Sequence, residues 1–254
     1  MSFWPEPYRG AISLTFDDGL PSQLNLAIPM LDKAGLRGTF YLNPTGSQES
    51  AGIGDSWMER LEPWKPIQAR GHEIGNHTIL HPCSLNVYLE WQYSKNLLNW
   101  TLDQIQQDVL EAQRRIQEAF PAQKANSFGY PCYEDSVGRG KNRITYSPFI
   151  AAHFAAARHK GELRGELAND AIYCDLHHLS SWPVEFQRCE FMIGLAETAV
   201  HLGRWGVFTF HGIDEGKLLV GANELQNLVD FLSRRNDIWV APLAEIGAYV
   251  REHT

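Results

Sequence analysis

The chain has 254 residues, of which 44% are hydrophobic and 20% are charged, a composition typical of a globular protein. Its formal net charge of -8 argues against nucleic acid and anionic membranes as main partners, because both attract basic surfaces. It contains no apolar run of 18 or more residues, so the sequence predicts no membrane-spanning helix. The N-terminus is too short and polar for a signal peptide, which predicts a cytoplasmic protein, or an exported one if a leader has been removed.

Strand-like and helix-like segments alternate along the chain, in the manner of a parallel sheet covered by helices. The expected strands are 11–16, 38–43, 72–77, 127–131, 154–158, 171–176, 206–211 and 237–242. The expected helices are 22–34, 58–69, 101–120, 184–201, 222–235 and 243–252. The alternation leaves two architectures open, a closed barrel or an open, doubly wound sheet.

Two of the expected helices carry signals at their ends. Ser22 is expected to cap the first helix, Pro29 to kink it and Gly35 to end it. Thr101 and Gln104 form the pattern of a capping box at the start of the third. Between the elements, the irregular segments 83–100 and 133–148 are long enough to be functional, and we expect them to form the walls of a cleft.

Polar residues gather where four of the expected strands end. They are Asp17 and Asp18, His77 and His81, residues 130–132, and His211. In parallel α/β folds the carboxyl ends of the strands meet at one side, where functional groups collect. These groups are therefore expected to converge, although they lie far apart in the sequence.

The spacing of His77 and His81 favours a metal site. On a helical turn, residues four apart share one face, so both imidazoles could reach one ion. Two histidines and one carboxylate are a common set of ligands for catalytic zinc. One of Asp17 and Asp18 would complete the set, and the other would take a proton from metal-bound water. Alone, the histidine pair could be a chance pattern and the aspartate pair a turn or a helix cap. Their occurrence together at the ends of expected strands favours the metal site.

The cysteines give a weaker signal. They are Cys83, Cys132, Cys174 and Cys189, and none forms a CxxC pair. We expect reduced, structural thiols. Cys174 with His177 and His178 resembles half of a zinc site, but the second half is missing, so no zinc is expected there.

Four stretches of the sequence carry a resemblance to a known family. "TFDDG", "GHEIGNHTILHP", "FGYPCY" and "FTFHG" resemble the successive motifs of the polysaccharide deacetylases, also called NodB-homology domains or carbohydrate esterase family 4. The closing "DIWVAPLAEIGAYV" resembles the family's last strand and helix. The resemblance runs from residue 12 to residue 249, and it implies one catalytic domain over 1–254 with a distorted (β/α)7-type barrel.

The same resemblance implies a role for each motif residue. Asp18, His77 and His81 would bind a divalent metal, zinc by analogy, with cobalt, nickel and manganese as alternatives. Asp17 would be the catalytic base and His211 the general acid.

The third motif would hold the oxyanion of the reaction and contact the substrate. The backbone amide of Cys132 is the implied oxyanion donor, and Tyr130 and Pro131 beside it are expected substrate contacts.

Two departures from the family pattern concern the groups that orient the catalytic residues. Gly129 stands where the family often has an arginine that orients the base. Arg158, at the end of an expected strand, is the predicted substitute, and the alternative is a solvated surface arginine. For the support of His211 the candidate is Asp175, with Trp182 nearby in the sequence.

The implied activity is the removal of acetyl groups from an N-acetylated or O-acetylated sugar or polysaccharide. One alternative is hydrolysis of another carbon–nitrogen bond, as in allantoinase-like relatives, and another is a carbohydrate-binding protein without catalysis. Indole rings near the loops could stack on sugars, although packing beneath the loops is favoured. These rings belong to Trp57, Trp64, Trp91 and Trp100. The sequence predicts no particular oligomeric state.

Overall fold

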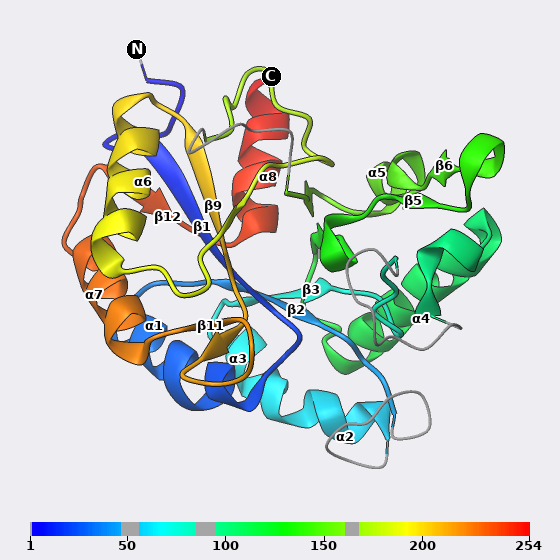
Figure 1. Ribbon diagram of the computed structural model, residues 1–254. Helices are drawn as coiled ribbons and strands as arrows, with labels where there is room; N and C mark the ends of the chain where they lie inside the picture. Colours follow the sequence, from blue (N-terminus) through cyan, green and yellow to red (C-terminus); the bar gives the residue numbers. More distant parts are fainter. Residues whose placement is uncertain (1, 47–55, 85–94, 161–167) are drawn as a thin grey trace.

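The computed structural model describes residues 2–46, 56–84, 95–160 and 168–254, and Trp91 lies outside them. Its centre is a parallel sheet whose main strand order is β7-β4-β3-β2-β1-β9-β8 (Figure 1). The strands are β1 (Gly10–Asp17), β2 (Thr39–Leu42), β3 (Glu73–Asn76), β4 (Phe128–Gly129), β7 (Ala157–Arg158), β8 (Trp182–Pro183) and β9 (Trp205–Phe210). A further strand, β12 (Ile238–Val240), pairs with the first half of β1, while β2 pairs with its second half.

The sheet curls into a distorted barrel because one segment contacts both of its edges. β8 pairs with β9, and Leu179, just before β8, bridges to Arg158 of β7. The N–H of Leu179 donates to the carbonyl of Ala157, and the N–H of His159 donates to the carbonyl of Leu179. The expected (β/α)7-type barrel is confirmed, with its shortest strands at the junction.

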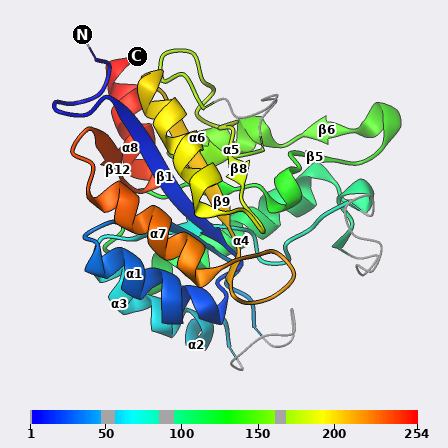
Figure 2. The ribbon, with the colours of Figure 1, turned by 60° about the vertical axis from the view of Figure 1, so that its left-hand side comes forward.

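Helices and small sheets surround this barrel (Figures 1 and 2). The helices are η1 (Gln23–Ala27), α1 (Ile28–Lys33), α2 (Trp57–Leu61), η2 (Glu62–Trp64), α3 (Lys65–Ala69), η4 (Leu97–Asn99), α4 (Leu102–Ala119), η5 (Pro131–Tyr133), η6 (Gly140–Asn142), α5 (Ser147–His153), α6 (Cys189–His201), α7 (Ala222–Ser233) and α8 (Leu243–His253). Two small sheets pair β5 (Ser136–Val137) with β6 (Ile144–Thr145) and β10 (Gly212–Ile213) with β11 (Leu219–Val220). Figure 2 shows α6, α7 and α1 side by side along the outside of the sheet.

β1 is the longest strand, and it pairs with three others, β2, β9 and β12. All its residues are buried, as expected for a parallel strand covered on both faces. The ring of Phe16 stacks against Phe40 of β2 and Phe210 of β9, with centroids 4.8 and 5.0 Å apart. This aromatic layer fixes the spacing of three strands just below the ends that carry the candidate site.

The start of β3 is anchored by a buried carboxylate, Glu73. Its oxygens accept hydrogen bonds from the side chains of Thr39 and Ser127 and from the backbone N–H groups of Ser127 and Ala244. One side chain thus joins β2, β3, the segment before β4 and the first turn of α8. Because β3 leads directly to His77, this anchor also fixes the position of that histidine along the strand direction.

The helix-end signals were partly right. Thr101 and Gln104 form the predicted capping box, and Gly35 ends α1 with a φ of 69°. Ser22 makes no side-chain cap, because its Oγ accepts the N–H of Ile213 instead. The expected kink takes the form of the π-helical turn η1, which is followed by α1 with Pro29 in its first turn.

One expected strand and one helix start were wrong. Residues 171–176 form turns, because the Asp170 side chain accepts the N–H of Ile172 and its carbonyl accepts those of Tyr173 and Cys174. The strand of this region is β8 instead, so the helix expected to start at Val184 begins at Cys189.

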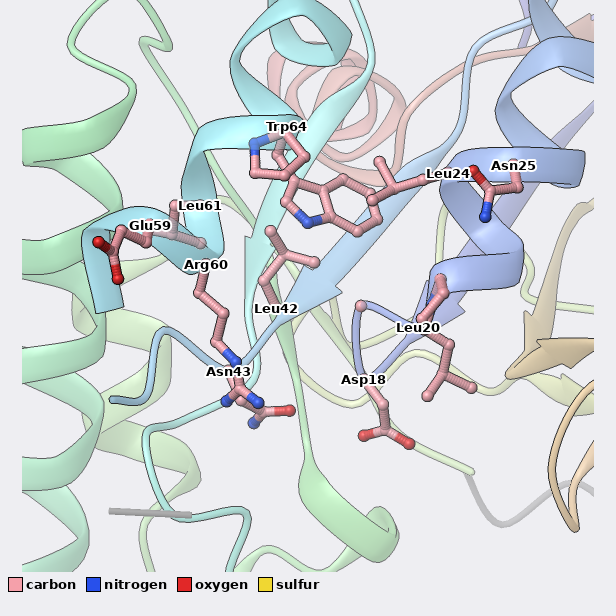
Figure 3. A pocket seen from close by; sticks show the side chains of 13 residues that line it. Asp18, Leu20, Leu24, Asn25, Leu42, Asn43, Glu59, Arg60, Leu61 and Trp64 are labelled. Atoms are coloured by element: carbon pink, nitrogen blue, oxygen red, sulfur yellow. The ribbon is translucent and has the colours of Figure 1, made fainter. Parts of the chain in front are cut away.

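A cavity of about 390 Å³ lies beside the carboxyl end of β1 (Figure 3). It is enclosed by η1, by α2 with η2, and by the end of β2. Across the described ranges, no helix combines the length and apolar character needed to cross a membrane.

Candidate active site

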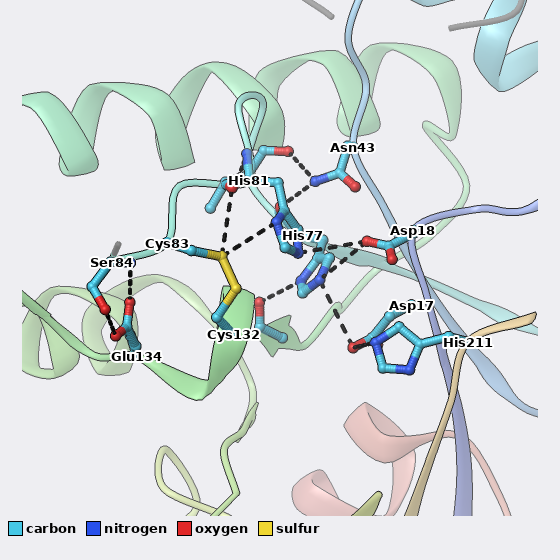
Figure 4. Close-up of a disulfide and its surroundings, with 12 residues drawn as sticks. Asp17, Asp18, Asn43, His77, His81, Cys83, Ser84, Cys132, Glu134 and His211 are labelled. Carbon is cyan, nitrogen blue, oxygen red and sulfur yellow. Dashed lines mark hydrogen bonds and ion pairs between the residues drawn. A yellow bond between two sulfur atoms is a disulfide. The ribbon is translucent and has the colours of Figure 1, made fainter. Parts of the chain in front are cut away.

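The polar groups predicted at the strand ends do converge (Figure 4). Asp17 and Asp18 stand at the end of β1, His77 follows β3, and His211 follows β9. The Nε2 of His77 lies 3.8 Å from an oxygen of each aspartate. The Nε2 of His81 lies 3.5 Å from Asp18 Oδ1.

Asp18, His77 and His81 have the geometry of a metal-binding group. One ligand atom from each lies within 4.8 Å of the others. Tetrahedral zinc with ligands at about 2.0–2.2 Å separates them by roughly 3.4 Å, close to the two contacts of Asp18 Oδ1. Small side-chain movements would therefore bring all three onto one ion.

His77 is held in the tautomer that a metal ligand needs. Its Nδ1–H donates to the carbonyl of Gly129 at 2.7 Å, which leaves Nε2 without a proton and facing Asp18. Burial is the main reason why the pKa of His77 falls to about 4, so the ring is neutral at physiological pH.

His77 and His81, four residues apart, are brought together by a tight turn and not by a helix. Thr78 and His81 both adopt left-handed backbone conformations, with φ of 64° and 48°. Asn76 Oδ1 accepts the N–H of Thr78, and Thr78 Oγ1 accepts the N–H of His81. The amide of Asn43 donates to the carbonyls of His77 and Thr78. The predicted helical turn is therefore wrong, although the two imidazoles meet with centroids 4.7 Å apart.

Asp17 is a buried carboxylate, only 3% exposed. Burial, the largest influence, raises its pKa, but the positive guanidinium of Arg158 and two imidazoles outweigh it. The pKa of Asp17 therefore lies below its ordinary value, and the group stays ionised at neutral pH. Its Oδ1 is buried and has no hydrogen-bond partner among the described residues.

Arg158 reaches Asp17 from the strand next to Gly129. The two residues are paired in register on β7 and β4, and a Cβ atom on Gly129 would lie 3.0 Å from Arg158 Nη2. The guanidinium donates to Asp17 Oδ2 and Thr209 Oγ1, both at 2.7 Å, and is fully buried. The predicted contact is thus present, through one hydrogen bond to the carboxylate where two were expected. The alternative of a solvated surface arginine is wrong.

His211 lies between two carboxylates. Its Nε2 is 3.7 Å from Asp17 Oδ2, and its Nδ1 is 3.2 Å from Glu185 Oε1, an ion-pair distance without the alignment of a hydrogen bond. Burial, the largest influence, lowers the pKa of His211, but Glu185, Asp17 and Asp18 together raise it above its ordinary value. The imidazole is therefore more readily protonated than in water.

Glu185 occupies the place for which Asp175 was the candidate. The side chain of Asp175 is 66% exposed and contacts His177, so that assignment is wrong. Trp182 does mark the correct region of the chain, since it begins β8, and Glu185 is the second residue after that strand ends. Sequence reasoning missed Glu185 because β8 itself was missed.

Gln23 joins the two strand ends that carry Asp17 and His211. It is fully buried, and its Nε2 donates to the carbonyls of Asp17 and His211 at 2.5 and 3.0 Å. One amide therefore fixes the separation of β1 and β9 at the point where both side chains leave the sheet.

The sequence profile described as "Polysaccharide deacetylase" matches residues 6–141, more than half of the chain. The chain belongs to the polysaccharide deacetylase family. The resemblance found in the motifs is confirmed, and the match covers every predicted site residue except Arg158, Asp175 and His211.

Solved structures of similar fold agree with this assignment. A Mycobacterium smegmatis protein whose name assigns it to the polysaccharide deacetylases has a TM-score of 0.64 at 16% identity, over 98% of this chain and 92% of its own. A family 4 acetyl xylan esterase from Clostridium thermocellum, solved with cobalt, has a TM-score of 0.53 at 20% identity, over 93% and 89%. A Bacillus anthracis pseudoenzyme of the same family has a TM-score of 0.53 at 16% identity, over 96% and 66%. At these identities the likeness concerns the fold alone. No curated protein matches.

In this polysaccharide deacetylase fold, a disulfide joins the loop of His81 to the third motif. Cys83 and Cys132 are bonded, with Cα atoms 5.8 Å apart, which corrects the expectation of four reduced thiols. Beside the bond, Glu134 accepts hydrogen bonds from the N–H and hydroxyl of Ser84 (Figure 4). Spacing could not reveal the pair, because 49 residues separate the two cysteines.

The other predicted residues of the third motif are less exposed than expected. The side chain of Tyr130 is 1% exposed and packs among aromatic rings, and Pro131 is buried as well. Their positions do not suit direct contact with a substrate. Cys132 has a left-handed backbone, with a φ of 52°, and the role of its amide stays a prediction.

The remaining sequence candidates are structural. His177 Nε2 bonds the carbonyl of Phe154, and His178 Nε2 contacts Asp135, so neither joins Cys174 in a metal site. Among the tryptophans, Trp64 and Trp100 are buried, while Trp57 lies half-buried beneath two arginines.

The disulfide generates a testable prediction. Replacing both cysteines in Cys83→Ser/Cys132→Ser should lower the free energy of unfolding by roughly 2–4 kcal/mol, because the cross-link restricts a long loop of the unfolded chain. Metal affinity should fall too, since His81 is next but one to Cys83. Urea unfolding and metal titration measure both quantities.

The matched control is Cys174→Ser/Cys189→Ser, which keeps the disulfide and removes the two free thiols. It should change stability far less. Four reactive thiols in the unreduced, unfolded protein would contradict the assignment of the bond.

Proposed function

We propose that this family member is a metal-dependent hydrolase that removes acetyl groups from an N-acetylated or O-acetylated sugar or polysaccharide. The observation that carries the proposal is the position of Asp17 and His211. Neither belongs to the metal-binding group, yet Asp17 lies 3.8 Å from His77, and His211 lies 3.7 Å from Asp17. A site that only bound metal would have no need of either.

Asp18, His77 and His81 would hold the metal. Two neutral imidazoles and one carboxylate are the donors that zinc favours, and cobalt, nickel or manganese also accept such a set. A bound divalent ion lowers the pKa of a coordinated water and polarises the acetyl carbonyl.

Asp17 is suited to take the proton of the attacking water. It is ionised at neutral pH, and its Oδ1 is available while Arg158 holds Oδ2. A base fixed in this way needs little reorganisation when the proton moves. The backbone N–H of Cys132 is the proposed donor to the oxyanion that forms on the acetyl group.

His211 is suited to return a proton to the leaving sugar nitrogen or oxygen. Glu185 faces Nδ1, so a protonated ring presents its second N–H, on Nε2, toward Asp17 and the reacting groups. The carboxylates around it favour the imidazolium, which is the form that a general acid requires.

Metal analysis and an acetate-release assay over acetylated sugars test the proposal. The wild-type protein should bind about one divalent ion and release acetate. Asp17→Asn should keep the ion and lose roughly 10²–10⁴-fold in turnover, since it removes the base without removing a metal ligand. His77→Ala should lose the ion. If the metal-loaded wild type released no acetate from any substrate, the protein would be a pseudoenzyme and the proposal would fail.

Arg158 gives a second prediction. Arg158→Met should lower kcat by roughly 10²-fold, because a base displaced by about 1 Å loses that much rate. It should also cost about 3–5 kcal/mol of stability, since Asp17 is left buried and unpaired. The double variant Arg158→Met/Asp17→Asn should regain much of that stability, which urea unfolding measures.

The control for Arg158 is Arg188→Met, at a side chain that is 79% exposed. It should leave kcat and the free energy of unfolding unchanged. Wild-type kinetics in Arg158→Met with metal bound would show that Asp17 needs no such partner.

Glu185 gives a prediction on pH. Its carboxylate raises the pKa of His211, so Glu185→Gln should lower that pKa and move the basic limb of the kcat/KM profile to lower pH. Glu190→Gln, at an exposed glutamate, is the matched control and should leave the profile in place. An unmoved basic limb in Glu185→Gln would exclude His211 as the titrating acid.

A further inference from the structure

The cavity beside Asp18 has walls of hydrocarbon. Leu20, Leu24, Leu42, Leu61 and Trp64 line it, and its volume of about 390 Å³ is within the range of small-molecule sites. Figure 3 shows the indole of Trp64 and the carboxylate of Asp18 on opposite sides of the lining, and of the two residues Trp64 is buried and Asp18 exposed. A cavity of this kind lowers the free energy of an apolar group that leaves water.

Three polar side chains of the lining are engaged within the protein, and the other two, Asp18 and Asn25, belong to exposed residues. The amide of Asn43 donates to backbone carbonyls, and Arg60 contacts Thr45 Oγ1. Glu59 caps the first turn of α2 through Ser56. A sugar ring placed inside would bury hydroxyl groups with few partners, which costs free energy, whereas an alkyl or aryl group needs none.

The cavity joins the candidate metal centre through one residue. Asp18 lines the cavity, and the same carboxylate approaches His77 and His81. Gly19, beside it, has a φ of 62°, and a Cβ atom there would lie 2.9 Å from the side chain of Leu42. The missing side chain keeps the end of the cavity next to Asp18 open.

The position of the cavity indicates which part of a substrate it receives. Asp17, His77, His81 and His211, which surround the reacting carbonyl in the proposed function, are absent from its lining. An acyl chain is bonded directly to that carbonyl and would have to run among those residues. A substituent on the sugar begins about one ring further away and can enter past Asp18.

We propose that this cavity binds an apolar substituent of the sugar that carries the acetyl group. The substrate class is then an alkyl or aryl glycoside of an acetylated amino sugar, and not an unsubstituted polysaccharide. This inference rests on the proposed deacetylation, and it adds a specificity that the catalytic groups do not determine.

The test compares the methyl and hexyl glycosides of N-acetylglucosamine as substrates. Each buried methylene should improve KM by roughly fourfold, so burial of only about half of the additional methylenes would already make kcat/KM for the hexyl glycoside about 30-fold higher than for the methyl glycoside. In Leu24→Trp, which places an indole in the cavity, this ratio should fall to within about threefold of one.

The matched control is Leu26→Trp. Leu24 and Leu26 are both half-buried residues of η1, but only Leu24 lines the cavity. Leu26→Trp should keep the hexyl preference, and circular dichroism and thermal melting should show that both variants fold. Loss of the preference in both would attribute it to a disturbed η1 and overturn the assignment.

Two results would refute the inference while leaving the deacetylation intact. One is acetate release with equal kcat/KM for both glycosides. The other is a preference for an N-hexanoyl over an N-acetyl group on the methyl glycoside, which would place the acyl chain in the cavity.

If no glycoside released acetate, the proposed function would fail, and calorimetric binding would still decide the role of the cavity. Tighter binding of the hexyl than of the methyl glycoside, lost in Leu24→Trp and kept in Leu26→Trp, would support it. Equal binding of the two glycosides would refute it.

Discussion

The candidate site depends on one buried ion pair, between Arg158 and Asp17. An ionised carboxylate that is 3% exposed is strongly unfavourable unless a positive group and hydrogen bonds compensate it. Arg158 supplies the charge, and its second nitrogen binds Thr209 of β9. The pair therefore connects β7, β1 and β9 through the interior of the barrel. The rings of Tyr41 and Tyr133 also contact the guanidinium, with their centroids 5.1 and 5.3 Å from its carbon.

The same pair shows how a site can keep an interaction while its sequence motif changes. The family often places the orienting arginine where this chain has Gly129. Arg158 is the in-register neighbour of Gly129 on the next strand, and the space that a side chain on Gly129 would need is taken by its guanidinium. Adjacent parallel strands are about 4.8 Å apart, a distance that a long arginine side chain spans easily. A comparison of the motifs position by position would show only that the arginine is missing, and would not reveal that Arg158 makes the contact instead.

The sequence predicted those features that depend on local pattern or on single strand ends. The alternation of strands and helices, the capping box at Thr101 and the convergence of the aspartates with the histidines all belong to this class. The closed barrel was implied by the family resemblance, because the alternation alone also allowed an open sheet. The misses concern long-range pairing. The Cys83–Cys132 bond joins two loops that no periodicity connects. Glu185 reaches His211 only because β8, two residues long, closes the barrel beside β9. Such a short strand has no alternation of polar and apolar residues to reveal it.

Left-handed backbone conformations concentrate at this site. Seven non-glycine residues among those described have φ between 48° and 74°. Five of them adjoin the metal-binding group or its neighbouring loop, namely Asp18, Thr78, His81, Cys132 and Tyr133. At about 1 kcal/mol or more each, they amount to a substantial fraction of the stability of an ordinary domain.

The contacts that offset this strain are also the ones that position the residues of the candidate site. Asn76 and Asn43 hold the turn between His77 and His81, while the disulfide and Glu134 hold the third motif against it. Contacts within the protein thus hold the three candidate ligands in place, which would reduce the entropy lost when a metal or substrate binds. Because each anchor opposes the relaxation of a strained turn, removing one anchor should move ligands that it does not touch. The strained turns and the contacts that hold them therefore determine together where Asp18, His77 and His81 lie.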